Sequence, residues 1–146
     1  MKKLVTGLFT TLALASAAFA QDTPSADGAR VFFANLEDGA TVSGPVTVVF
    51  GLEGMGVAPA GVEYENSGHH HLLLNRPPMG EGEEGAEELL YGIPADDNHI
   101  HFGKGQTQVT LDLPEGTHTM QLVLGDLNHV PHVAPVMSEV ITITVK

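Results

Sequence analysis

The stretch Gly44–Glu53, GPVTVVFGLE, decides the fold class because its apolar residues alternate with others. Val46, Val48, Phe50 and Leu52 stand two positions apart, so in an extended strand their side chains share one face. One apolar face beside a mixed face is typical of a half-buried β-strand. We therefore predict a strand over this stretch, with the four apolar side chains directed into a core.

Runs of the same kind recur along the chain, and turn residues such as Asp38-Gly39, Pro114-Glu115-Gly116 and Gly125-Asp126 accompany them. They lie at residues 30–36, 107–113, 117–126 and 138–146. Many short strands divided by turns need two sheets, each of which buries one face against the other. The predicted fold is an all-β, antiparallel, immunoglobulin-like β-sandwich of about seven strands, forming a single domain over residues 30–146.

Residues 1–20 have the features of a secretory signal peptide. Two lysines precede an apolar run, and small residues lead to Ala20. We predict cleavage after Ala20 and a periplasmic or secreted protein that does not insert in the membrane once the signal is removed. Residues 21–29 are small and polar, and we expect them to form a flexible N-terminal segment.

A segment at about residues 76–97 interrupts the strand pattern with prolines, glycines and a run of glutamates. We predict a long acidic surface loop there, with no more than a short helical turn near AEELLYG. The formal net charge of the whole chain is −12. This charge argues against nucleic acid and anionic lipid as partners.

Eight histidines are concentrated in a few short segments of the sequence. Side chains at positions i and i+2 of a strand share a face about 6.5–7 Å apart, so each H-x-H motif could present two imidazoles to one side. Two such motifs occur, and a proline-containing loop at residues 125–135 adds an H-x-x-H motif. The predicted metal ligands are His69, His71, His99, His101, His129 and His132.

Structural roles fit the two remaining histidines better. His70 falls on the strand face opposite its neighbours, and His118 is in phase with the apolar residues of its predicted strand. We expect the first H-x-H pair to point toward the second. Loops at one end of a sandwich come together, so we also expect His129 and His132 to lie within reach of both pairs.

Imidazole ligands suit zinc, copper, nickel and iron, and the affinity order of divalent ions peaks at copper. We therefore predict a copper site, with zinc as the alternative. The chain has no cysteine, so neither a disulfide nor a thiolate ligand can form. No nucleophile elbow, phosphate loop or HExxH motif occurs, so the sequence favours a binding protein over an enzyme.

Four phrases together resemble an exported bacterial family, domain of unknown function 4399. They are residues 30–61, residues 68–75 (GHHHLLLN), residues 96–132 (DDNHIHFGKGQTQVTLDLPEGTHTMQLVLGDLNHVPH) and residues 138–145 (SEVITITV). The resemblance implies a small histidine-rich periplasmic β-domain in which all eight histidines belong to family motifs. A weaker similarity is to copper-zinc superoxide dismutases, which also place histidines on an antiparallel sandwich.

We interpret the chain as a periplasmic metal-binding protein that sequesters or transports copper through its histidines. Its partners would be the metal ion and a second periplasmic protein. One alternative is a structural or protein-interaction β-domain, in which the histidines form a hydrogen-bond network around Asn66, Asn98 and Asn128. Another alternative is a metal-dependent oxidoreductase of the superoxide dismutase type.

Overall fold

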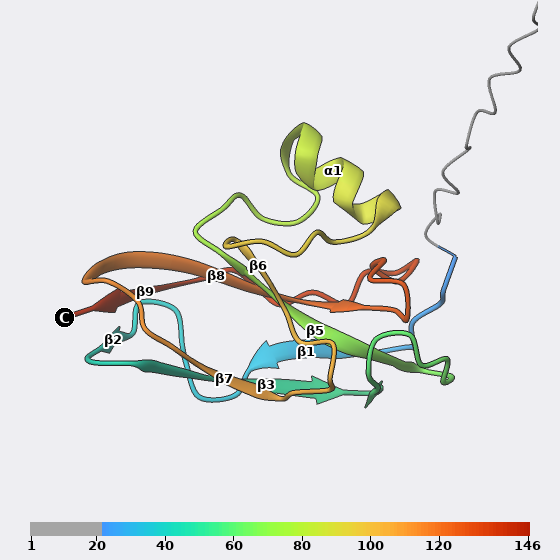
Figure 1. Cartoon of the computed structure of the whole chain (residues 1–146), viewed down its shortest axis with the longest axis horizontal. Coiled ribbons are helices and arrows are strands. Elements are labelled where there is room, and N and C mark those ends of the chain that lie inside the picture. Colours follow the sequence, from blue (N-terminus) through green and yellow to red (C-terminus); the bar gives the residue numbers. More distant parts are fainter. Residues whose placement is uncertain (1–21) are drawn as a thin grey trace, which may run out of the picture.

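A computed structural model of the chain describes residues 22–146 (Figure 1). The predicted signal peptide, residues 1–20, lies outside the described residues. The elements are β1 (Arg30–Phe33), β2 (Thr41–Val42), β3 (Val46–Glu53), β4 (Gly56–Val57), β5 (Ser67–Leu74), α1 (Gly82–Tyr91), β6 (His99–His101), β7 (Gln108–Leu111), β8 (Gly116–Gly125) and β9 (Ile141–Val145).

The strands form two layers, as the all-β prediction requires (Figure 1). One sheet has the order β1-β3-β7 and the other the order β2-β9-β8-β5-β4, with β6 also paired to β5. Most pairs are antiparallel, while the short pairs β2-β9 and β4-β5 are parallel. The fold is therefore a sandwich-like arrangement in which β5 pairs with β8 along one side and with β4 and β6 along the other.

The main core lies between the two sheets and contains the alternating residues of the opening stretch. Val46, Val48 and Phe50 are buried there, and Leu52 packs against the core from its edge. From the facing sheet, β5, β8 and β9 contribute Leu72, Leu122 and Ile143 among others. Alternation along the strands thus places one apolar row of each sheet in the shared core.

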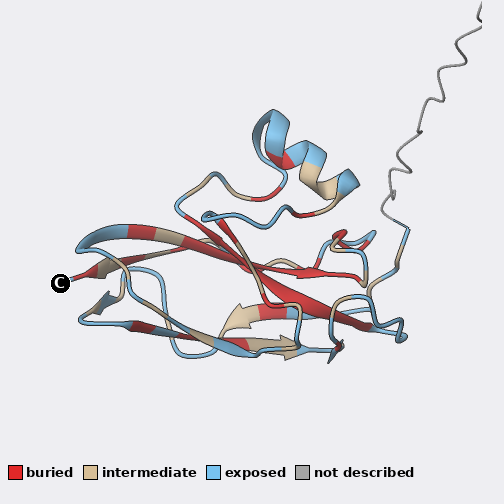
Figure 2. Cartoon of the chain, in the orientation of Figure 1, coloured by how far each residue is buried: buried red, intermediate tan, exposed pale blue. Residues whose placement is uncertain are grey.

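Strand β5 is buried along its whole length (Figure 2). Its even-numbered residues face the main core, and its odd-numbered residues face away from the three-stranded sheet. A second apolar cluster covers part of that outer face, where Leu73 and Val123 pack with Met79 and Ile93 from residues 76–97. Residues 76–97 therefore cover the part of the outer face that contains Leu73 and Val123.

Residues 76–97 do not form only a loop, because they contain the ten-residue helix α1. Leu89 packs onto the second cluster, and Glu83 and Glu84 lie in the first turn, where the helix dipole favours negative charge. The helix packs above the outer face of the large sheet (Figure 1). The packing of Leu89 stabilises this helix, which the weak apolar periodicity of the segment did not predict.

Residues 22–29 also make specific contacts, although their composition led us to expect a flexible segment. The backbone N–H of Val133 donates to Thr23 O at 2.9 Å, and Ser25 Oγ donates to Ala134 O at 2.9 Å. These bonds attach the segment to the chain that follows β8. Within residues 22–146, no helix combines the length and apolarity needed to cross a membrane.

Candidate metal centre

Strand β5 directs His69 and His71 to the outer face of the large sheet and His70 to the main core. His70 packs against the ring of Phe50, with centroids 5.0 Å apart. In the pairing of β5 with β6, His71 is directly opposite His101, and their ring centroids are 5.1 Å apart. The predicted orientation of the three consecutive histidines is therefore confirmed.

Four imidazoles meet on this outer face. His69, His71, His101 and His129 each have one ring nitrogen within 4.8 Å of the corresponding nitrogens of the other three, an arrangement that could hold a metal ion. The first two are buried, and the last two are partly exposed. The group thus has a closed side on β5 and an accessible side formed by β6 and by the loop after β8.

The shortest contacts in the group converge on one nitrogen. His69 Nε2 lies 3.0 Å from His71 Nε2 and 3.0 Å from His129 Nδ1. A neutral imidazole nitrogen carries either one hydrogen or one in-plane lone pair, so it cannot make two well-directed hydrogen bonds with these neighbours. Three lone pairs directed at a shared point are instead what a bound cation requires.

Separations of this size are close to those of a metal site. With metal–nitrogen bonds of about 2.0–2.1 Å, the nitrogens of a tetrahedral centre lie roughly 3.3 Å apart. The two contacts of 3.0 Å are slightly shorter than this, and the upper limit of 4.8 Å is longer. Coordination would therefore require small side-chain rotations of the rings, the buried pair His69 and His71 included.

Two glycines leave the space that these rings occupy. A Cβ added at Gly103 would lie 2.3 Å from His101 Cε1 and 2.5 Å from His101 Nε2. At Gly125, an added Cβ would lie 2.9 Å from His71 Nε2. A side chain at either position would displace an imidazole, so both glycines help to define the site.

Burial lowers the pKa of three of the clustered imidazoles. Desolvation, with a smaller contribution from the charges of His129 and His101, lowers the pKa of His69 from 6.5 to about 4. For His71, desolvation and then the neighbouring His69 lower the pKa to about 2. Burial also lowers the pKa of His101. Neutral imidazole is the form that binds metals, so these nitrogens stay available for coordination in mild acid.

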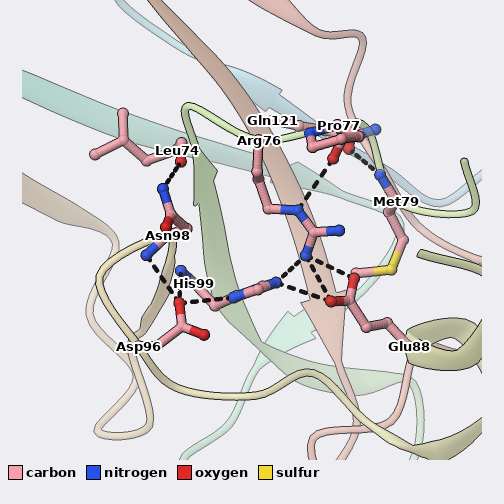
Figure 3. A network of polar contacts seen from close by, with 9 residues as sticks. All are labelled: Leu74, Arg76, Pro77, Met79, Glu88, Asp96, Asn98, His99 and Gln121. Carbon is pink, nitrogen blue, oxygen red and sulfur yellow. Dashed lines mark hydrogen bonds and ion pairs between the residues drawn. The ribbon is translucent and has the colours of Figure 1, made fainter. Parts of the chain in front are cut away.

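The predicted ligand His99 lies outside the group because its ring nitrogens have other partners (Figure 3). Its Nδ1 lies 2.8 Å from Asp96 Oδ1, and this hydrogen bond lowers the pKa of Asp96. Its Nε2 contacts Nη1 of Arg76, which also binds Glu88 at 2.7 and 2.6 Å. The same Nε2 also lies 3.0 Å from Glu88 Oε1. Both ring nitrogens of His99 are therefore engaged by residues outside the four-histidine group.

His132 and His118 also lie apart from the four-histidine group. His132 is fully buried, and its Nδ1 and Nε2 lie 3.4 Å from Leu124 O and 3.3 Å from Ser67 O. His118 contacts the Asn75 amide through Nδ1 and donates from Nε2 to Pro114 O at 2.8 Å. The structural role expected for His118 agrees with these bonds. Of the two predicted ligands in the loop after β8, His129 faces the four-histidine group, whereas His132 faces backbone carbonyls and lies outside it.

A family model, domain of unknown function (DUF4399), matches residues 48–146. The chain belongs to the DUF4399 family. All four clustered histidines lie within the matched residues, as do helix α1 and the loop after β8. No curated protein and no solved structure matches the chain. The case for a function of this DUF4399 protein therefore depends on the geometry of the site.

Proposed function

We propose that this DUF4399 protein is a periplasmic metal-binding protein that sequesters or transports copper. The ligands would be His69, His71, His101 and His129. The observation that supports this proposal is the convergence of four imidazoles, from two strands and a loop, with ligand atoms within 4.8 Å of one another. Export to the periplasm is proposed from the signal-like residues 1–20.

The donor set favours Cu(II) among the common ions. An all-nitrogen site suits zinc and copper, and the divalent order places copper highest. Cu(I) prefers thioether or thiolate sulfur, but Met79 and Met137 pack in the second apolar cluster and Met120 packs in the main core. Zinc remains the alternative, since it also accepts four imidazoles in a tetrahedral arrangement.

Binding fits the site better than turnover does. Catalytic zinc centres typically have three protein ligands and leave the fourth position for water or substrate. Here four imidazoles are available, and they would complete a tetrahedral set. An oxidoreductase that binds its substrate at the metal would need a further coordination position beside these four imidazoles.

The main rival is a structural histidine network. The contacts of 3.0 Å between ring nitrogens would be its links. However, Nδ1 of His69, Nδ1 of His71 and Nε2 of His101 are buried with no hydrogen-bond partner among the described residues. A network that stabilises a core has its buried polar atoms satisfied, so these unpaired nitrogens count against a structural network. The Nδ1 atoms of His69 and His71 are not the atoms that would bind the metal, because these two rings converge through Nε2.

Metal analysis and titration test the proposal directly. The untagged protein should contain or take up one equivalent of Cu(II), measured by elemental analysis and by competition with a chelator of known affinity. His71→Ala should lose this tight site, whereas His118→Gln should keep it, because His118 binds Asn75 and Pro114 elsewhere. Weak uptake without stoichiometry, equal in all three proteins, would refute the proposal. Parallel titrations with Zn(II) and Cu(I) decide which ion the site prefers.

A further inference from the structure

The loop that carries His129 contains a buried carboxylate that the sequence marked only as part of a turn. Asp126 follows the last residue of β8 and is 3 % exposed. Carboxylates are rarely buried unless hydrogen bonds or charges compensate them. The contacts of Asp126 therefore indicate what this side chain does.

Asp126 Oδ1 organises the loop by accepting two backbone hydrogen bonds. The N–H of Asn128 donates to it at 2.8 Å, and the N–H of Val130 donates to it at 3.0 Å. The Asp126 backbone adds a bond from its N–H to Val130 O at 2.8 Å and accepts one from the N–H of His129 at 3.0 Å. These hydrogen bonds restrain the backbone on both sides of His129.

His129 has a backbone conformation that needs such support. Its φ is 68°, in the left-handed region that residues other than glycine rarely adopt. Residues held in this region persist when surrounding bonds over-determine the backbone, and they often occur at functional sites. Ile93, just after α1, adds a third restraint by donating its N–H to His129 O at 2.8 Å. The left-handed turn points the imidazole back toward β5.

The carboxylate also reaches beyond the loop. Thr23 Oγ1 donates to Asp126 Oδ2 at 2.7 Å, which connects the N-terminal segment to the loop. Asp126 also directly follows Gly125, where an added Cβ would lie 2.9 Å from His71 Nε2 and 3.4 Å from the Cα of His129. The carboxylate is therefore next to the four imidazoles, where a negative charge favours a bound cation.

We propose that Asp126 is the positioning residue of the metal centre, which holds His129 in its ligand orientation and supplies negative charge beside the four imidazoles. This inference rests on the proposed metal-binding function. Partners that hold ligands in this way typically change metal affinity 10–100-fold when they are replaced. The two roles are separable, because asparagine keeps an oxygen acceptor but carries no charge.

Two substitutions separate these roles. Asp126→Asn should retain the loop, since its amide oxygen can still accept from Asn128 and Val130, and it should lower Cu(II) affinity about tenfold through loss of charge. Asp126→Ala should release the loop and lower affinity about 100-fold. Its Cu(II) electron paramagnetic resonance spectrum should also show one nitrogen ligand fewer. Asp112→Asn, at an exposed position after β7, is the matched control and should change neither property.

Amide hydrogen exchange of the metal-free proteins provides a test that does not depend on copper. The N–H groups of Asn128 and Val130 should be protected in the wild type and in Asp126→Asn, and should exchange at least tenfold faster in Asp126→Ala. Unchanged protection in Asp126→Ala, or lost protection with unchanged Cu(II) affinity and spectrum, would overturn the inference. A wild type that binds no metal but shows the expected exchange would instead overturn the proposed function alone.

Discussion

The replacement of His70 by leucine should stabilise the metal-free protein in mild acid. His70 is fully buried, packs against Phe50, and neither of its ring nitrogens makes a hydrogen bond of normal geometry within the described residues. Burial lowers its pKa from 6.5 to about 4, although the nearby backbone of Gln106 opposes the shift. Leucine is similar in volume, has no polar atom, and takes up no proton.

The size of the effect follows from proton linkage. At pH 5 about 97 % of unfolded molecules but only about 9 % of folded molecules have a protonated His70, so unfolding takes up nearly one proton at this side chain. A folded pKa below the unfolded value means that stability is present above pH 6.5 and is lost as the pH falls toward 4. At pH 5 this loss is about 2 kcal/mol, and at pH 8 it is close to zero. The gain from His70→Leu should therefore be about 2 kcal/mol larger at pH 5 than at pH 8.

Urea denaturation of chelator-treated wild type and His70→Leu at the two pH values measures this difference. Subtracting the stability gain at pH 8 from the gain at pH 5 cancels any effect of altered packing that is the same at both pH values. As a control, His118→Leu removes a buried histidine whose nitrogens are hydrogen-bonded, and it should destabilise the protein by about 1–3 kcal/mol at pH 8. A stability gain for His70→Leu that is equal at both pH values would show that His70 is not held neutral by burial.

Three further predictions concern the site and its surroundings. Cu(II) at about one hundred times its dissociation constant should add about 2.7 kcal/mol to the free energy of unfolding. Thermal melts should show that His101→Ala loses this stabilisation and that His99→Gln keeps it. The reverse result would make His99, and not His101, the ligand. Gly103→Ala would place a methyl group 2.3 Å from the His101 ring, so competition titration should show Cu(II) affinity at least tenfold weaker. Unchanged affinity would show that Gly103 does not define the position of the His101 ring. Glu88→Gln should leave Arg76 without its buried charge partner and cost about 3 kcal/mol in urea denaturation, whereas a cost below about 1 kcal/mol would show that the pair is solvated.

The strand pattern could be predicted because the sandwich imposes a period of two on every strand. The same period placed His69 and His71 on one face, and the pairing of β5 with β6 then brought His71 opposite His101. Helix α1 could not be predicted with the same certainty. It depends on the packing of Leu89 against a cluster whose other members come from β5, from β8, from the loops that flank the helix and from Met137.

The ligand set was only partly predictable, because the i, i+2 rule says which side chains share a face and not which other groups compete for them. His99 shares a face with His101, yet Arg76 and Glu88 take its ring nitrogen, and these residues stand 23 and 11 positions away in the sequence. The left-handed turn at His129 depends on Asp126. The Gly125-Asp126 turn was the available signal for that residue, but a turn signal does not reveal what the side chain will bind.

The histidines outside the group show what this fold does with an imidazole that has a structural task. Both ring nitrogens of His99 and both of His118 have hydrogen-bond partners. The partners are the side chains of Arg76, Asp96 and Asn75 and the backbone carbonyl of Pro114. The sandwich can therefore satisfy a buried imidazole, although it does not do so for His70. The stronger evidence for a cation is the pair of 3.0 Å contacts of His69 Nε2 with His71 Nε2 and His129 Nδ1. One imidazole nitrogen cannot make two well-directed hydrogen bonds with these neighbours, whereas a bound cation would accept a lone pair from each of the three nitrogens.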